Sequence, residues 1–200
     1  MQQIIVGTKN KAKLAQIKGA LASLQLNIVG LSDNNLPSIE EDGKTAQENA
    51  KKKALVYAKV LGQPVLSMDN ALYFEGLSDE EQPGINVRRI KGRSDRPTDN
   101  ELLEYYSKLV EELGDKVNAH WDFAICFAYP DEKVHETTIV SPRIFTSKIS
   151  SKVIEGYPLE SIQIDPKTDK YISEMTQEEQ DVFWQEVIGK KLCQFIKSII

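Results

Sequence analysis

The chain has 200 residues and a formal net charge of −5, with 40% hydrophobic and 28% charged residues. This composition is typical of a globular protein with a buried core, as one large domain or two modest lobes. The acidic balance argues against general binding to nucleic-acid polymers or anionic membranes, although it allows a local basic pocket. Because the sequence shows neither a signal-peptide pattern nor an apolar run of membrane-spanning length, we expect a cytoplasmic protein.

The cysteine and histidine content is low. Cys126 and Cys193 lie far apart in apolar surroundings, so we interpret them as buried thiols of a reducing compartment; nothing supports a disulfide between them. The two histidines, His120 and His135, belong to no Cys/His cluster, which makes a structural zinc site unexpected.

Short apolar runs alternate with helical patterns in the first third of the chain. Thr45 and Glu48 have capping-box spacing, so Thr45 is expected to begin a helix that Gly62 ends. The expected elements are a strand over 3–6, a helix over 11–24, a strand over 26–31, a turn over 34–37, an acidic loop over 39–43, a helix up to 61 and a strand over 65–68. This alternation predicts a mixed or parallel sheet covered by helices.

The rest of the chain continues the mixture of helices and strands. We expect a long loop or partly helical lid over 76–97, a helix from there to 113, a strand over 121–129, one or two strands over 136–149, a turn over 156–158 and a final helix over 178–199. The strand over 121–129 rests on alternation of apolar residues, and the final helix on apolar residues near helical spacing.

Asp69 is the most informative polar residue because it follows a short apolar run, 64–66, that predicts a buried strand. A carboxylate at the end of such a strand is costly unless a charged or hydrogen-bonding group meets it. At the carboxyl end of a strand in an α/β protein, that group is often a ligand or metal. We therefore favour ligand or metal contact over a hydrogen-bonded core aspartate.

Three further segments carry charged or polar groups. The turn at 8–13 brings a strand end to a helix N-terminus, which can present backbone N–H groups to an anion. Taken alone, however, this segment favours a capped surface helix, and the acidic cluster at 40–42 favours a solvated loop. The three lysines at 51–53 are adjacent on one helix and cannot share one direction, so at most one is expected to point into a cleft.

Taken together, these segments carry a family resemblance. The matching pieces are TKNKAK at 8–13, EDGKTAQENAKKKA at 41–54, MDNAL at 68–72 and PGINVRR at 83–89. In order and spacing, over roughly the first 130 residues, the chain resembles the inosine triphosphate pyrophosphatase family, the noncanonical purine nucleoside triphosphate pyrophosphatases.

The resemblance implies a fold, a reaction and a site. The fold is α/β, with an elongated mixed sheet, flanking helices and two lobes around a central cleft that holds the nucleotide, and the whole chain, 1–200, forms one such two-lobed domain. The reaction is magnesium-dependent hydrolysis of a nucleoside triphosphate to the monophosphate and diphosphate by a homodimer. The implied phosphate ligands are Thr8, Asn10, Lys13 and Lys53. The implied Mg²⁺ carboxylates are Glu41 and Asp69, of which Asp69 also orients or deprotonates the attacking water.

The chain departs from the family next to Asp69. Met68 stands where the family has a first aspartate, and Asn70 and Ala71 stand in place of serine and glycine. Losing that aspartate removes a charge near the metal, whereas Asn70 can still donate to a phosphate. Ala71 adopts positive φ less readily than glycine.

The departures are larger in the second half. Tyr157 and Glu160 fall on the stacking phenylalanine and the aspartate of the family's base-reading segment, and base stacking or plain turn packing of Tyr157 are both open. Gln180 and the triplet 184–186 replace a lysine and a Ser-His-Arg triplet that contact the purine; for Trp184 we favour core packing. Such changes at a hydrogen-bonding site predict altered base specificity.

Three functions follow as hypotheses. The main one is an active pyrophosphohydrolase whose partner is a nucleoside triphosphate, purine or modified. The second is a nucleotide sensor that keeps the phosphate site but hydrolyses poorly, since Met68 and the missing triplet weaken the family pattern. The third and weaker one is a purely structural partner protein, which specific triphosphate affinity would exclude.

Overall fold

The framework is a mixed six-stranded sheet with flanking helices, seen in a computed structural model that describes residues 2–31 and 36–200. The strand order is β2-β1-β3-β4-β5-β6. The strands are β1 (Gln2–Val6), β2 (Leu26–Gly30), β3 (Val65–Phe74), β4 (Lys116–Ala128), β5 (Val134–Thr146) and β6 (Gln163–Ile164). β1 pairs in parallel with β2 and β3, and β5 pairs antiparallel with β6, which confirms the predicted mixed sheet. Part of the turn predicted over 34–37 lies outside the described residues.

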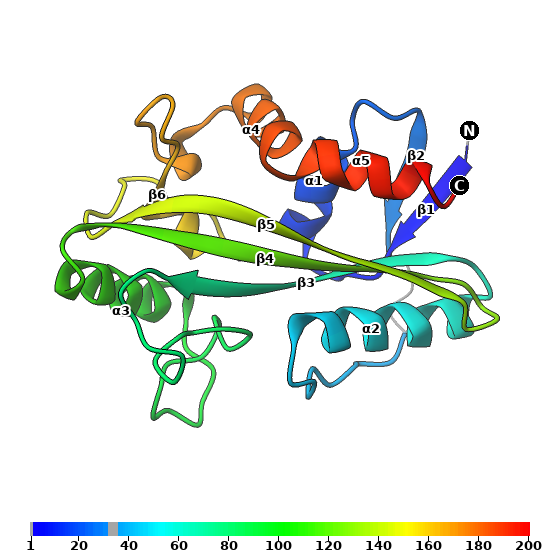
Figure 1. The fold of residues 1–200 in the computed structure, drawn as a ribbon, viewed down its shortest axis with the longest axis horizontal. Helices are drawn as coiled ribbons and strands as arrows, with labels where there is room; N and C mark the ends of the chain where they lie inside the picture. The colour runs from blue at the N-terminus through cyan, green and yellow to red at the C-terminus, as the bar shows by residue number, and fades with distance from the viewer. Residues whose placement is uncertain (1, 32–35) are drawn as a thin grey trace. The chain divides into compact units, whose positions relative to one another are not determined.

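Helices flank the sheet (Figure 1). The α-helices are α1 (Lys11–Ala20), α2 (Ala46–Leu61), α3 (Asp99–Glu112), α4 (Gln177–Trp184) and α5 (Lys190–Lys197). Short 3₁₀ helices occupy Pro158–Ser161 (η1) and Ile172–Glu174 (η2), and a π-helical turn, Gln185–Gly189 (η3), joins α4 to α5. The predicted final helix is therefore one helical segment that contains a widened turn.

The chain divides into two compact units, and β3, β4 and β5 each pass from one unit into the other. Unit 1 comprises residues 1–70, 122–140 and 181–200. Its buried apolar residues include Ile4, Val6, Ile17, Leu21, Ala50, Ala54, Leu66, Phe123, Ile188, Leu192 and Ile196. Within this unit α5 lies beside α1 (Figure 1).

Unit 2 comprises residues 71–121 and 141–180. Its core joins α3 to the strand segments of the unit and includes Leu72, Phe74, Leu102, Tyr106, Val110, Val117, Phe145, Leu159 and Ile162. α3 begins at a full capping box: Thr98 Oγ1 accepts the Glu101 N–H, and Glu101 Oε2 accepts the Thr98 N–H. This fixes the first turn of α3, whose first residue is Asp99.

Several boundaries differ from the sequence predictions. The strand predicted over 65–68 runs on to Phe74, so Asp69 lies inside β3 rather than at its end; the following apolar residues continue the strand, and Leu72 pairs with Gly84. The helix predicted over 11–24 ends at Ala20, because Leu24 bonds to the Leu21 carbonyl in a turn.

Local contacts explain three smaller differences. Thr45 caps α2 as predicted, but Glu48 accepts the Lys44 amide at 2.7 Å instead of reaching back to Thr45. The predicted strand over 121–129 begins earlier, at Lys116, and 136–149 gives one strand that ends at Thr146. The bounds of both strands are set by their paired neighbours in the sheet, which the sequence does not reveal.

Both cysteines, Cys126 and Cys193, are free and buried, as predicted. In the part of the chain that the structure describes, no helix is both long and apolar enough to cross a membrane.

Candidate active site

The turn from β1 into α1 is set by its own polar side chains. Asn10 caps α1: its Oδ1 accepts the N–H groups of Ala12, at 2.9 Å, and Lys13, at 3.2 Å. Thr8 Oγ1 accepts the Asn10 N–H at 3.1 Å, which leaves the threonine hydroxyl hydrogen to donate. Thr8 and Asn10 therefore shape the helix N-terminus that was predicted to meet an anion.

β1 ends at Val6, and beyond this point the edge of β3 is no longer paired with β1. The last β1–β3 pair is Val6 with Leu66, whose carbonyl accepts the Gly7 N–H at 2.8 Å. Two residues further on, the Met68 carbonyl accepts a hydrogen bond from Lys13 Nζ at 3.2 Å. Alternate residues of a strand present their peptide groups to the same edge, so Lys13 takes the place where β1 stops. The early end of β1 thus brings the first turn of α1 against β3.

Four predicted site residues of unit 1 meet in one ionic cluster. Lys53 Nζ lies 2.7 Å from Glu41 Oε1 and 3.2 Å from Asp69 Oδ1. Lys13 Nζ lies 3.8 Å from the same Asp69 oxygen. The side chains of Lys53, Asp69 and Lys13 are 11%, 13% and 16% exposed, whereas Glu41 is 53% exposed. Two ammonium groups and two carboxylates thus lie together, and the Glu41 side of the cluster is open to solvent.

The neighbouring lysines of α2 point elsewhere. Lys52 pairs with Asp42 at 2.6 Å, and Lys51 pairs with Glu136 at 2.9 Å; both lysine side chains are at least 40% exposed. The expectation that at most one of these three lysines turns inward is confirmed, with Lys53 as the one.

Burial changes the proton affinity of Lys13. Desolvation, helped by the positive charge of Lys53, lowers its pKa from the usual 10.5 to about 8. Asp69 and Glu41 act in the opposite direction. Lys13 is therefore a cation that titrates within the range of ordinary assay conditions.

The residues that depart from the family take distinct positions. Met68 is buried, at 3% exposure, and its backbone carbonyl accepts the hydrogen bond from Lys13 Nζ. Asn70 Oδ1 is buried and, among the described residues, has no hydrogen-bond partner. Ala71 is 1% exposed and lies within β3. An unsatisfied amide oxygen next to Asp69 is unusual, because buried acceptors are normally hydrogen-bonded.

Asn49 supports the loop that carries Glu41, and the sequence analysis did not single it out. It is 3% exposed on α2, and its Oδ1 accepts the Gly43 N–H at 2.8 Å. A polar residue one turn before Lys53, on the apolar face of a helix, was the available signal.

The predicted base-side residues lie in unit 2, at the start of η1. Gly156 has φ +80°, a backbone conformation that favours glycine, and it precedes the half-buried Tyr157. Glu160 is 7% exposed; burial raises its pKa to about 7, although Arg143 opposes that change. Burial also raises the pKa of the Tyr157 hydroxyl.

The residues that replace the family's base-contacting lysine and triplet have structural contacts. Trp184 is 7% exposed, and its ring centroid lies 5.0 Å from that of Phe183 and 6.4 Å from that of Phe123. This confirms the predicted core packing. Gln180 Nε2 donates to the Ile172 carbonyl at 3.4 Å.

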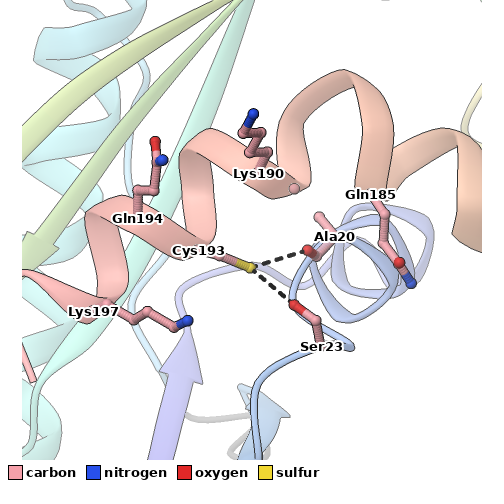
Figure 2. A pocket seen from close by; sticks show the side chains of 8 residues that line it. Ala20, Ser23, Gln185, Lys190, Cys193, Gln194 and Lys197 are labelled. Atoms are coloured by element: carbon pink, nitrogen blue, oxygen red, sulfur yellow. Dashed lines mark hydrogen bonds between the residues drawn. The ribbon is translucent and has the colours of Figure 1, made fainter.

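A separate cavity of about 300 Å³ lies in unit 1, lined by residues from α1, η3 and α5 and their flanks. Figure 2 shows Cys193 Sγ facing the Ala20 carbonyl, 3.6 Å away, and Ser23 Oγ, 3.4 Å away. Lys190 and Gln194 point away from that sulfur (Figure 2). The cavity contains none of the predicted site residues.

Comparisons with known proteins agree over nearly the whole chain. A sequence model described as the Ham1 family matches residues 4–183. The dITP/XTP pyrophosphatase of Wigglesworthia glossinidia brevipalpis is 31% identical over 202 residues, which cover 99% of this chain and 98% of that protein. The dITP/XTP pyrophosphatase of Halalkalibacterium halodurans is 30% identical over 185 residues, covering 90% and 91%.

Solved structures share the fold. The Ham1 protein of Staphylococcus aureus superposes with a TM-score of 0.71 at 23% identity, covering 98% of this chain and 99% of its own. The HAM1 protein of Coxiella burnetii gives a TM-score of 0.70 at 22% identity, covering 99% and 100%. At this identity the likeness establishes the fold alone.

Proposed function

The chain belongs to the Ham1 family, and we propose that it hydrolyses noncanonical or modified purine nucleoside triphosphates to the monophosphate and diphosphate, with Mg²⁺. The support is the family membership together with relatives named dITP/XTP pyrophosphatase that match it over nearly its full length. The observation that carries the proposal to particular residues is the Lys53 ammonium held between Glu41 and Asp69, with Lys13 beside them.

The residues present suit a magnesium ion that is shared with a substrate. Among residues 2–31 and 36–200, no group of three or more His, Cys, Asp or Glu side chains is placed to hold a metal. Mg²⁺, however, usually takes one or two carboxylates and completes its shell with water and phosphate oxygens. Glu41 and Asp69 would supply those carboxylates. The ion would offset charge on the phosphates.

The chain's own groups would perform the remaining tasks. Thr8 and the α1 N-terminus capped by Asn10 donate to phosphate oxygens, and Lys13 and Lys53 offset the charge that develops on the leaving diphosphate. Asp69 orients the water, and accepts its proton, as the bond between the α- and β-phosphates breaks. Positioning and electrostatics account for most catalysis of this kind, so the preformed ionic cluster suits the task.

The base side would use Tyr157 for stacking, with the buried Glu160 near it. Stacking on an aromatic ring tolerates different bases, whereas hydrogen bonds to base edges discriminate between them. Since Trp184 packs in the core and Gln180 bonds to the backbone, we expect base selection to differ from the family pattern.

A panel of canonical and deaminated nucleoside triphosphates, assayed for diphosphate release with Mg²⁺, tests the proposal. At least one noncanonical purine triphosphate should be hydrolysed, and Asp69→Asn and Glu41→Gln should abolish the release. If the pure wild-type protein yields no diphosphate from any nucleotide, the hydrolase proposal fails.

The second candidate function is a nucleotide sensor, favoured by the buried Met68 side chain where the family has a carboxylate. Calorimetry that shows tight, Mg²⁺-dependent triphosphate binding without turnover would support the sensor, and rapid turnover would eliminate it. On the family resemblance we further propose that the protein is a cytoplasmic homodimer. Size-exclusion chromatography with light scattering measures its molar mass in solution and so tests the dimer.

A further inference from the structure

An ion pair from two other segments holds the turn that carries Tyr157. Arg88 Nη2 lies 2.5 Å from Asp99 Oδ1. The other carboxylate oxygen, Asp99 Oδ2, accepts the Gly156 N–H at 2.7 Å, and Arg88 Nη1 donates to the Gly156 carbonyl at 3.2 Å. The backbone N–H and the carbonyl of one glycine are thus both bound, and the three residues close a ring of hydrogen bonds.

Helix α3 determines where this ring forms. Asp99 is its first residue, directly after the capping residue Thr98, where a carboxylate also interacts favourably with the helix dipole. Two turns later, on the same face, the buried Tyr106 hydroxyl donates to the Val87 carbonyl at 3.1 Å. α3 therefore holds both Asp99 and the backbone next to Arg88.

Gly156, the glycine that this ring of hydrogen bonds holds, determines the conformation of the turn. Gly156 has φ +80°, and the next N–H, that of Tyr157, bonds to the Ile154 carbonyl at 2.9 Å. Fixing both polar atoms of Gly156 orients its peptide group, and that orientation sets the direction in which the chain enters Tyr157.

We propose that Arg88 and Asp99 are positioning residues for the nucleotide base: they hold Gly156 so that Tyr157 is already oriented to stack when the nucleotide arrives. The inference rests on the proposed function, in which Tyr157 stacks on the base. Preorganising a binding group lowers the cost of ordering it on binding. The pair therefore acts on the affinity for the nucleotide and leaves the triphosphate side and the chemical step unchanged.

The same loop supplies a matched control. Arg93 pairs with Asp95 and with Glu101, which lies in the first turn of α3. The distance from Arg93 Nη1 to Glu101 Oε1 is 2.7 Å. The Arg93 side chain is 35% exposed, similar to the 40% of the Arg88 side chain. Arg93→Ala thus removes the same charge from the same loop without touching the bonds to Gly156.

The test compares Arg88→Ala, Asp99→Ala and Arg93→Ala for turnover of the best nucleotide and for inhibition by inorganic tripolyphosphate, which carries no base. Arg88→Ala and Asp99→Ala should raise KM about tenfold, the scale of one lost charge-assisted hydrogen bond, and leave kcat within about twofold. The inhibition constant of tripolyphosphate should not change. Asp99→Asn, which keeps an acceptor for the Gly156 N–H, should raise KM less.

Each other outcome has a definite meaning. If Arg88→Ala and Asp99→Ala behave like Arg93→Ala, the positioning role is wrong. If tripolyphosphate inhibition weakens as much as KM rises, the pair supports the general structure rather than the base side, and the proposal is again overturned. Failure of the proposed function shows in the wild-type protein before any variant is made. If the wild type binds a nucleotide without turnover, the same comparison of variants is made with the dissociation constant of that nucleotide in place of KM. If the wild type binds no nucleotide, both proposals fail.

Discussion

Lys53 and Asp69 form an ion pair from which water is nearly excluded: Nζ lies 3.2 Å from Oδ1, and the two side chains are 11% and 13% exposed. The same ammonium reaches the open carboxylate of Glu41 at 2.7 Å. A buried pair is weak evidence for stability in itself, but removing one partner leaves the other charge buried and uncompensated. The pair therefore couples the stability of unit 1 to the proposed site.

Replacing Lys53 by methionine should reveal that coupling. We expect Lys53→Met to lower the free energy of unfolding by about 3 kcal/mol, because Asp69 loses its nearest cation. Diphosphate release should fall by at least about a hundredfold, since a cation that offsets charge on the phosphates is lost. Urea unfolding followed by circular dichroism and the diphosphate assay measure the two effects.

The preceding lysine is the matched control. Lys52 pairs with Asp42 at 2.6 Å, but both side chains are at least 40% exposed. Exposed pairs contribute little, so Lys52→Met should leave stability and diphosphate release near wild type. Equal losses in the two variants would show that helix α2, and not the inward ammonium, is what matters.

Lys13 should make substrate binding depend on pH. Burial lowers its pKa to about 8, and Lys53 contributes in the same direction. A protonated Lys13 attracts the triphosphate, so KM should rise as the pH increases through 8 and the charge is lost. Since each pH unit above the pKa lowers the protonated fraction tenfold, we expect a rise of roughly eightfold between pH 7.5 and 9. Initial rates across that range measure it.

The control is Lys13→Arg, because arginine stays charged throughout the range. That variant should bind triphosphate with a flatter dependence of KM on pH, whatever its absolute affinity. A wild-type profile that coincides with that of Lys13→Arg would mean that another group titrates.

The order of strands and helices could be predicted from sequence periodicity, whereas strand lengths could not. Asp69 and Asn70 interrupt the apolar pattern of β3, so the sequence suggests that the strand ends there. In the structure β3 continues, and Leu72 exchanges both backbone hydrogen bonds with Gly84, twelve positions later. Such pairing is decided by a partner segment that local pattern does not specify.

The site shows the same division. That at most one of the three adjacent lysines of α2 turns inward followed from helix geometry, and the resemblance indicated Lys53. The ring of Arg88, Asp99 and Gly156 was not predicted, because its members are distant in sequence and each alone has the appearance of an ordinary loop or cap residue. Only the folded chain brings their polar atoms together.

Glu160 should make stability fall as the pH rises. Burial raises the pKa of its carboxyl from 4.5 to about 7 in the folded protein. Between these values the folded state keeps a proton that the unfolded state has released, so the free energy of unfolding decreases with pH and levels off above about 7. The decrease from this one group is about 3 kcal/mol. Nearby Arg143, with a pKa of about 10, stays charged throughout.

The measurement is urea unfolding between pH 4.5 and 8 for wild type and Glu160→Gln. Glutamine does not titrate, so the difference in unfolding free energy between wild type and variant should shrink by about 3 kcal/mol over that range. Glu155→Gln, an exposed change in the neighbouring turn, should follow the wild-type curve. A difference that does not vary with pH would show that folding leaves the pKa of the Glu160 carboxyl unchanged.

A side chain at position 7 should destabilise the protein, because Gly7 lies close to side chains of β3. A Cβ at this position would lie 2.5 Å from Ser67 Oγ and 3.0 Å from Val65 Cγ1. Gly7→Ala should therefore lower the free energy of unfolding by about 2 kcal/mol, as overpacking does. Because Gly7 directly precedes Thr8, triphosphate binding should weaken as well. Ser67→Ala removes the nearest atom, so the double variant should recover about 1 kcal/mol relative to the sum of the single changes. Strict additivity of the two changes in urea unfolding would locate the strain elsewhere than in this contact.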